Sequence, residues 1–330
     1  MPASAQPSVR SYVGIAKEVT PGTAVIATDF IPLAKDSLKP VDLIAPLYDT
    51  GLRGSMALNY NYIQGRRYTE IDLGGPVFAD TVGYWLGGIL GSVATSGASA
   101  PYTHVISLKN ATAIGADAQP TSFTIEDMYV ANNRFYPGCK VSNFTMNFNS
   151  EGMLEYTAKL MGFPSSTTAI ASPSFSAVTP TPTWRGTVSI GGSTVGYTTD
   201  GSVTMTRSSE AIFGIDTTQG PYEIFLGSLD STGSFTFVME NDTELTRFLS
   251  DTKPILNVSF TQGASAALTE VAFNITKGAY TTAVIDRSAD HVTVSVDFSA
   301  IANTTDAGAT AGYAPIKWTL RNAVVSGTYQ

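Results

Sequence analysis

The stretch that decides the fold class is Val141-Ser142-Asn143-Phe144-Thr145-Met146-Asn147-Phe148-Asn149, the most regular alternation of apolar and polar residues in the chain. Its two phenylalanines and its methionine would share one face and its polar residues the other, which is typical of a half-buried β-strand. A Ser-Glu-Gly turn at 150–152 leads into a second alternating run at 154–160. The two runs therefore predict a β-hairpin.

Working towards the N-terminus, the same pattern predicts another hairpin. Residues 54–64 and 68–73 both alternate, and Gly65-Arg66 between them has the composition of a turn. The apolar spacing at 78–89 is that of an amphipathic helix, with Pro76 near its start and Gly91 after its end. Strand-like runs follow at 102–108 and 122–129.

Working towards the C-terminus, residues 162–183 are rich in Pro, Ser and Thr and carry little charge, which is typical of a linker or an extended arm. The pattern of the first half then recurs. We expect strands at 202–206, 222–226, 235–237, 255–260 and 271–275, a capping box at 241–244 that starts a short helix, and a hairpin of 292–298 with 316–321.

The order hairpin, helix, strands, hairpin thus occurs twice, with little residue identity between the halves. We expect a β-rich α+β fold of two tandem domains, each a β-sandwich or partial barrel with long hairpins and one flanking α-helix. The boundaries would be 1–165, a linker at 166–183, and 184–330. The alternative to an internal duplication is a coincidence of pattern, since any β-rich chain with two helices can be aligned in this way.

Composition limits the possible partners and compartments. The 19 basic and 27 acidic residues give a net charge of −8, which disfavours gripping nucleic acid or anionic lipid. The single cysteine, Cys139, cannot form an internal disulfide, and the N-terminus lacks a secretory signal pattern, so we expect a reducing cytoplasm. The longest apolar run, 77–90, is shorter than a membrane span.

The sequence offers little catalytic chemistry. His104 and His291 are the only histidines, so a histidine triad or multi-histidine metal site is disfavoured, and neither a phosphate-binding loop nor a dinucleotide fingerprint is present. Two acidic residues near each other are the minimum requirement for glycoside hydrolysis, although such pairs usually lie on a solvated face. They are Glu70 with Asp72, Glu126 with Asp127, and Glu151 with Glu155. We assign no catalytic, metal or cofactor-binding residue and expect no enzyme activity.

Several phrases in the first half carry a family resemblance. They are Tyr12-Val13-Gly14-Ile15-Ala16-Lys17-Glu18-Val19-Thr20-Pro21-Gly22-Thr23-Ala24, Gly74-Gly75-Pro76 before Trp85-Leu86, Pro101-Tyr102-Thr103-His104, Pro120-Thr121-Ser122-Phe123-Thr124-Ile125-Glu126 and Tyr136-Pro137-Gly138-Cys139-Lys140-Val141. In order and spacing they resemble the major tail tube proteins of siphophages, the long-tailed bacteriophages with non-contractile tails, over most of residues 11–165. The second half resembles that family through its pattern alone.

The resemblance implies a structural virion protein that polymerises into stacked rings and forms the conduit for DNA ejection into the host cell. With two tandem tail tube domains, three chains would make one ring. The implied partners are further copies of the chain, the tape measure protein, the tail terminator and tail tip proteins, and double-stranded DNA that passes without specific binding. The implied location is the virion tail, which would be assembled in the host bacterial cytoplasm. No membrane is among the implied partners. The alternatives are a carbohydrate-binding or adhesion β-sandwich and an enzyme of the carboxylate-pair type.

Two sets of residues follow as site expectations. Long hairpins leave open edges that another copy can pair with, and a closed ring would turn their polar face towards the channel. The expected lumen-facing residues are Asn59, Asn61, Glu70, Asp72, Asn147, Glu155, Thr204, Thr293 and Asp297. An apolar, proline-containing arm at about 20–53 would contact the next ring. Its expected contact residues are Phe30, Ile31, Leu33, Leu43, Ile44 and Leu47.

Overall fold

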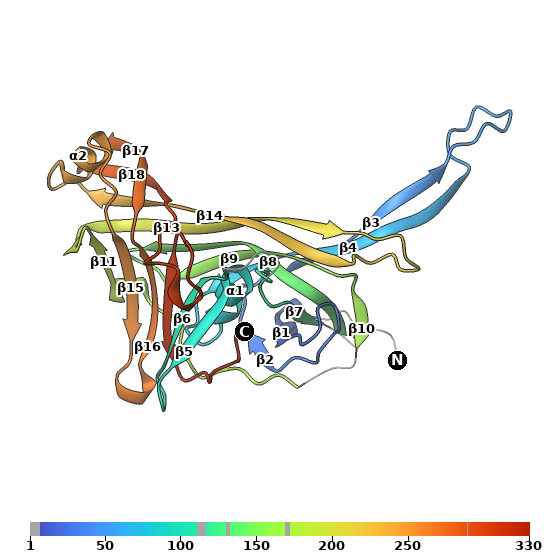
Figure 1. The fold of residues 1–330 in the computed structure, drawn as a ribbon, viewed down its shortest axis with the longest axis horizontal. Coiled ribbons are helices and arrows are strands. Elements are labelled where there is room, and N and C mark those ends of the chain that lie inside the picture. Colours follow the sequence, from blue (N-terminus) through green and yellow to red (C-terminus); the bar gives the residue numbers. More distant parts are fainter. Residues whose placement is uncertain (1–6, 111–116, 130–132, 169–171, 289) are drawn as a thin grey trace.

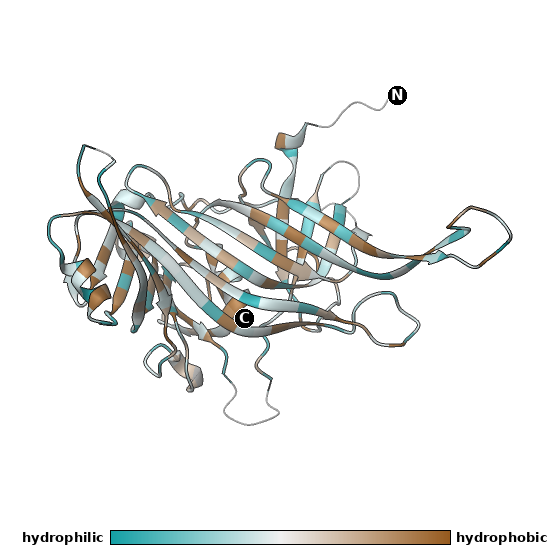
Figure 2. Cartoon of the chain, turned by 90° about the horizontal axis from the view of Figure 1, so that it is seen from above, coloured by the Kyte–Doolittle hydropathy of each residue, from teal (hydrophilic) through white to brown (hydrophobic). Residues whose placement is uncertain are grey.

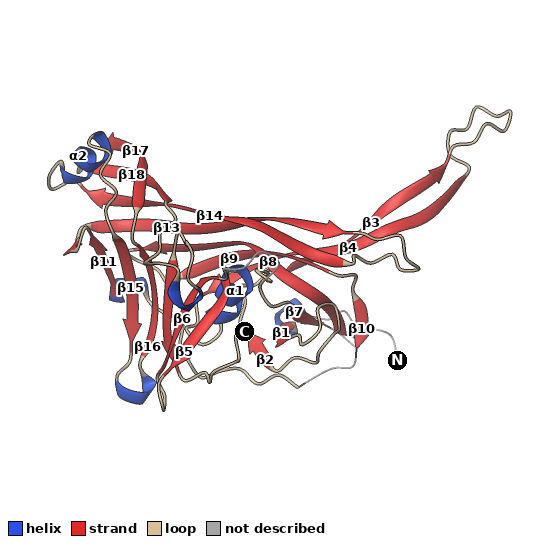
Figure 3. Ribbon diagram, viewed as in Figure 1, coloured by secondary structure: helices blue, strands red, loops and turns tan. Residues whose placement is uncertain are grey.

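The computed structural model describes residues 7–110, 117–129, 133–168, 172–288 and 290–330, which form two antiparallel sheets with few helices (Figure 3). The expected β-rich fold is confirmed. The two α-helices are α1 (Val82–Leu90) and α2 (Thr243–Leu249). The short 3-10 turns are Ser8–Arg10, Thr183–Arg185, Ser265–Ala267 and Gly308–Thr310.

Eight strands form one continuous sheet, called the main sheet below, which runs along the length of the molecule (Figure 1). Each strand is antiparallel to its neighbours. The order is β3 (Lys39–Asp49), β4 (Asn61–Pro76), β9 (Glu155–Gly162), β8 (Asn133–Asn149), β13 (Thr198–Ile212), β14 (Glu223–Val238), β18 (Thr293–Ala300) and β17 (Gly278–Asp286).

Strand β8 branches. Residues 140–149 belong to the main sheet, whereas residues 133–139 pair with β7 (Phe123–Met128) and β10 (Ser166–Thr168). From β7 the sheet continues to β1 (Tyr12–Lys17) and β2 (Asp29–Ile31). The β7–β8 ladder is interrupted at Pro137-Gly138, just before the change of partner, and Gly138 has a φ of 66° that favours glycine.

The second sheet lies across one face of the main sheet. Its order is β12 (Ser193–Thr194), β11 (Gly186–Ile190), β15 (Leu256–Gln262), β16 (Thr269–Ile275), β19 (Lys317–Asn322), β6 (Tyr102–Leu108) and β5 (Gly91–Ser96). Helix α1 is buried along its whole length and contacts β8, β5 and β6. Phe144 of β8 meets Trp318 of β19 edge-on with ring centroids 5.9 Å apart, so one core joins the two sheets.

The hairpin predicted from residues 54–64 and 68–73 is wrong. Residues 61–76 form the single strand β4, and its partner is β3, which sequence reasoning assigned to an arm. Pro40 and Pro46 lie in β3 because β3 is at the edge of the sheet, where a missing N–H is tolerated. Gly65-Arg66 marks a register shift opposite Ala45 and not a turn.

Two further expectations in the second half are corrected. The runs at 292–298 and 316–321 do not pair with each other, because β18 lies between β14 and β17 while β19 lies between β16 and β6. The capping box does not form, because the helix begins at Thr243 and its N-cap residue, Asp242, makes no side-chain capping bond. Buried Glu244 instead accepts hydrogen bonds from Arg247 (2.5 Å) and Tyr280 (2.6 Å).

Candidate assembly surface

The face of the main sheet turned away from the core carries mainly short polar side chains. One row runs across five strands, in which Glu155 stands opposite Asn147, Asn147 opposite Ser202, Ser202 opposite Ser234, and Ser234 opposite Asp297. Alternate residues of the same strands are buried, which is why the sequence alternates so regularly. We call this surface the polar face.

Cross-strand hydrogen bonds tie the polar face together at the β8–β13 junction, where the two halves of the chain meet. The hydroxyls of Thr145 and Thr204 are 3.0 Å apart, and the Asn143 amide donates to the Thr206 hydroxyl over 2.8 Å. Such pairs each contribute up to about 1 kcal/mol. The junction is therefore bonded through side chains as well as through the backbone ladder.

The residues expected to line a channel fall into two groups. Those on the polar face are Glu70, Asp72, Asn147, Glu155, Thr204, Thr293 and Asp297. Asn59 and Asn61 instead lie at the far end of the β3–β4 hairpin, exposed to solvent. Lys159 also lies on the polar face, 3.7 Å from Asp72, and both side chains are largely exposed, so this ion pair adds little stability.

The residues expected in an inter-ring arm are also divided. Phe30 and Ile31 are buried in the chain's own core, and Leu33 packs against it. Leu43 and Ile44 lie half-buried on β3, and Leu47 is exposed. Packing on the chain's own sheet thus accounts for the first three of these residues.

Beyond the body of the molecule, the β3–β4 hairpin projects and ends in a tip that carries both hydrophilic and hydrophobic residues (Figures 1 and 2). The side chains of Leu52 and Met56 are fully exposed, and Leu58 is 73% exposed. Exposed apolar residues that cluster at one place commonly mark an interaction site, whereas singly scattered ones do not. The tip therefore has the character of a contact surface.

The main sheet consists of two four-stranded units with matching irregularities. In the first, β8 carries an unpaired Ser142 between residues that face Leu160 and Lys159 of β9. In the second, β17 carries an unpaired Thr281 between residues that face Phe298 and Asp297 of β18. The bulged strand occupies the same position in both units, which have the orders β3-β4-β9-β8 and β13-β14-β18-β17.

A second irregularity also matches. The β3–β4 ladder shifts register after Ile44, and the β13–β14 ladder shifts in the same way after Arg207. Gly65 and Gly227 occupy equivalent positions in these shifts, where a Cβ would come within 3.0 Å of the Ala45 oxygen and 2.2 Å of the Ser208 hydroxyl respectively. A side chain at position 65 would crowd the backbone of the opposite strand, whereas at position 227 the neighbouring atom is the end of a flexible serine side chain.

The sheet edges show how the units are joined. The last strand of the first unit, β8, pairs with the first strand of the second unit, β13. Among the described residues, the equivalent outer strands β17 and β3 each pair on one side only. An unpaired strand edge is a template for pairing with another chain.

The sequence phrases that carry the family resemblance converge on one buried carboxylate. Glu18 is 4% exposed. Its oxygens accept hydrogen bonds from the hydroxyls of Ser122 (2.6 Å) and Thr124 (2.7 Å) and from the backbone amides of Gly22 (2.9 Å) and Gly138 (2.7 Å). These residues come from three separate phrases, so the phrases encode a structural node that fixes the loop after β1 against β7 and β8.

The chemistry-bearing residues are held in structural roles. His104 is buried, with its ring nitrogens 2.9 Å from the Thr95 hydroxyl and 3.0 Å from the Asn322 amide oxygen, and burial lowers its pKa. Burial raises the pKa of the Cys139 thiol far above its ordinary value. Sequence reasoning missed Glu18, although its place in a Lys-Glu phrase after an apolar strand was a usable signal.

The acidic pairs named from the sequence differ in their surroundings. Glu70 and Asp72 are exposed on the polar face, as is Glu155. Glu126 is buried and accepts a hydrogen bond from the Ala27 amide over 3.1 Å. Burial raises the pKa of Asp127 from 3.8 to about 6. The described residues hold no group of three or more His, Cys, Asp or Glu arranged to bind a metal ion.

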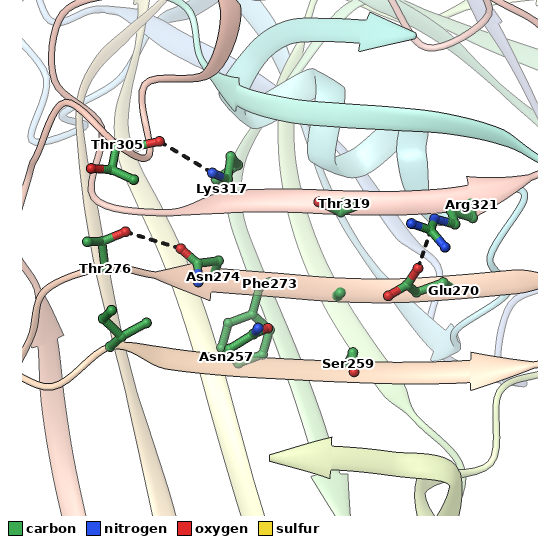
Figure 4. A pocket seen from close by; sticks show the side chains of 12 residues that line it. Asn257, Ser259, Glu270, Phe273, Asn274, Thr276, Thr305, Lys317, Thr319 and Arg321 are labelled. Atoms are coloured by element: carbon green, nitrogen blue, oxygen red, sulfur yellow. Dashed lines mark hydrogen bonds and ion pairs between the residues drawn. The ribbon is translucent and has the colours of Figure 1, made fainter. Parts of the chain in front are cut away.

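A shallow groove on the outer face of the second sheet is lined by residues of β15, β16 and β19 (Figure 4). Two of its charged groups neutralise each other, since Arg321 lies 3.2 Å from Glu270. Lys317 donates to the Thr305 backbone oxygen over 3.3 Å. These pairings leave a polar surface without an evident nucleophile and base, so the groove adds no candidate active site.

The features above define a class of protein, namely a β-structural subunit with open sheet edges, a polar sheet face and a projecting apolar hairpin. The comparison with family models agrees with this description. A family described as phage tail tube protein matches residues 8–300, and the chain belongs to that family. A search of curated proteins finds no match. The chain is thus a structural protein of the phage tail tube and a virion component.

This result supports the sequence-based expectation of a tail tube protein over the carbohydrate-binding or adhesion alternative. In the part of the chain that the structure describes, no helix is both long and apolar enough to cross a membrane.

Proposed function

We propose that three copies of this chain close into a ring with pseudo-sixfold symmetry, and that stacked rings form the tube through which DNA leaves the capsid. The observation that carries the proposal is the β8–β13 junction. Two units with the same strand order and the same irregularities are joined there last strand to first, while the corresponding strands β17 and β3 have one open side each in the described part of the chain. Repeating the same step around a circle would pair every edge.

The two units favour two tandem tail tube domains, with the division near residues 166–183. The main sheet supplies eight strands per chain, so a ring of three chains would be a barrel of 24 strands. Barrels of about 16 to 18 strands already enclose an aqueous channel. A 24-stranded ring is wide enough in principle to let a duplex pass.

In this arrangement the polar face lines the channel. Its carboxylates, Glu70, Asp72, Glu155 and Asp297, repel phosphate, its Lys159 is paired with Asp72, and its hydroxyl and amide groups carry no fixed charge. Double-stranded DNA would then pass without specific binding. The role is structural, with no catalysis and no cofactor.

The remaining partners follow from the same reading. The tape measure protein would occupy the channel during assembly, tail terminator and tail tip proteins would bind the two ends, and assembly would take place in the host bacterial cytoplasm. We also propose that the exposed hairpin tip, and not the buried Phe30 and Ile31, contacts the next ring.

Electron microscopy of the purified full-length chain at increasing concentration tests the proposal. We expect hollow filaments of uniform width, with image averages showing three chains per ring. Filaments with six chains per ring would overturn the trimeric arrangement, and a chain that stays monomeric at every concentration would overturn tube formation by this protein alone.

A further inference from the structure

The inner β8–β13 junction provides a template for the contact between chains. Its register is fixed by the structure, with Thr145 opposite Thr204 and Asn147 opposite Ser202. The bulges and register shifts described above relate β8 to β17 and β13 to β3 residue by residue. The pairing partner of the open edges can therefore be worked out position by position.

Counting from the bulged residues Ser142 and Thr281, Thr145 corresponds to Val284 and Asn147 corresponds to Asp286. Counting from the register shifts after Ile44 and Arg207 gives the corresponding residues of β3 and β13. There Thr204 corresponds to Val41, and Ser202 corresponds to Lys39.

We propose that β17 of one chain pairs antiparallel with β3 of the next chain in a defined register, with Val284 opposite Val41 and Asp286 opposite Lys39. The proposal rests on the ring closure proposed above and deepens it, because it names the residues at the contact. The partner is a second copy of this chain.

This register follows from the bulges and register shifts alone, and the side chains of β3 and β17 are complementary in it. Val41 is 50% exposed and Val284 is 58% exposed, and pairing them lets each apolar side chain cover part of the other's surface. Lys39 and Asp286 are both exposed, and pairing them sets opposite charges across the junction.

Neighbouring registers that keep the same faces together lose this match. Sliding one strand by two residues in one direction sets Val41 against Thr282 and Lys39 against Val284. Sliding it the other way sets Val41 against Asp286. A register shift of one residue would turn the apolar positions of one strand to the wrong face. The transferred register is thus the one that satisfies both pairs.

The direct test is cysteine cross-linking in assembled full-length protein. The double variant Val41→Cys with Val284→Cys should oxidise to covalent trimers under non-reducing electrophoresis. The matched control, Val41→Cys with Asp286→Cys, places the thiols two residues out of register and should cross-link several-fold less. The native Cys139 is buried and serves as the same background in both.

A charge exchange gives an independent readout. Lys39→Glu places like charges across the junction and should raise the critical concentration for assembly by about fivefold. Asp286→Lys alone should do the same. The double variant Lys39→Glu with Asp286→Lys restores the opposite charges and should return the critical concentration to the native value.

The outcomes separate this inference from the proposed function. Tubes that form normally but cross-link best in the control pair, or a double charge variant that assembles no better than either single variant, would overturn the register and leave the tube intact. A native chain that forms neither rings nor tubes would overturn the ring closure itself. Trimers linked through the matched cysteines support both.

Discussion

At the scale of single residues, Glu18 illustrates how a family phrase becomes a structural requirement. Four donors from three segments converge on its carboxylate, and removal of the carboxylate would leave them buried without an acceptor. We expect Glu18→Ala to lower the free energy of unfolding by about 3 kcal/mol or more. Denaturant unfolding measures this, with the exposed Glu151→Ala as control. Equal effects in both variants would contradict the role of the node.

Asp127 gives a residue-scale prediction about pH. Its pKa is raised from 3.8 to about 6 by burial, so the folded state favours the protonated form. The stabilising effect of protonation is present below about pH 4 and is lost as pH rises through 6. Asp127→Asn should therefore stabilise the protein at pH 7 by about 2 to 3 kcal/mol and make little difference at pH 4.

Unfolding curves at several pH values between 4 and 7 check this prediction. Asp230→Asn, which changes an exposed carboxylate, is the matched control. If the Asp127 variant and the native chain lose stability in parallel as the pH rises, burial of Asp127 has no energetic consequence.

At the scale of elements, two variants of the β3–β4 hairpin distinguish the role of its open sheet edge from the role of its tip. Deleting residues 36–48 would remove most of β3 and with it the open edge. Replacing residues 50–60 by Asn-Gly keeps both strands and removes only the exposed tip. We expect the Asn-Gly replacement to give rings that no longer elongate into tubes, which electron microscopy would show.

The triple variant Leu52→Ser, Met56→Ser and Leu58→Ser is the companion experiment, because it leaves the backbone of the tip unchanged while removing its apolar surface. It should shorten tubes in the same way. Tubes of native length from both variants would exclude the tip as a contact between rings.

The elements also show what sequence reasoning reaches and where it stops. Alternation predicted β8, β9 and helix α1, because their periodicity reflects burial on one side or in the core. Pairing partners were missed, since β18 and β19 alternate equally well and only the core decides their neighbours. Strand β3 was missed because its prolines oppose a central strand but not an edge.

The candidate site was predictable to a similar degree. The sequence placed Glu155, Thr204 and Asp297 on one polar face, because period-2 alternation fixes which side chains share a side of a strand. It could not place Asn59, which lies beyond the last paired residue of the hairpin. Open edges were expected from the long hairpins, but their assignment to β3 and β17 was not, since it depends on the order of strands in the completed sheet.

At the scale of the whole molecule, the two halves are packed together through paired strands and shared core contacts, despite their matching units. Strand β6 pairs with β19, and β8 pairs with β13. Arg207 donates to the Ile89 backbone oxygen at the end of α1 over 3.0 Å. Tyr329 packs against Tyr84 of α1 with ring centroids 5.2 Å apart. Each half therefore completes the core of the other.

This interdependence gives a prediction for separated halves. Residues 1–165 alone would expose the surfaces covered by Trp318 and Tyr329, and full burial of each such side chain contributes about 1.5 to 3 kcal/mol. With the β6 and β8 edges open as well, we expect this fragment to aggregate or to lack a cooperative unfolding transition. Co-expression with residues 166–330 should restore a soluble complex whose circular dichroism matches that of the full chain. A fragment 1–165 that unfolds cooperatively by itself would show that the first unit is an autonomous domain, and that the pairing across the halves is an addition to a core already complete.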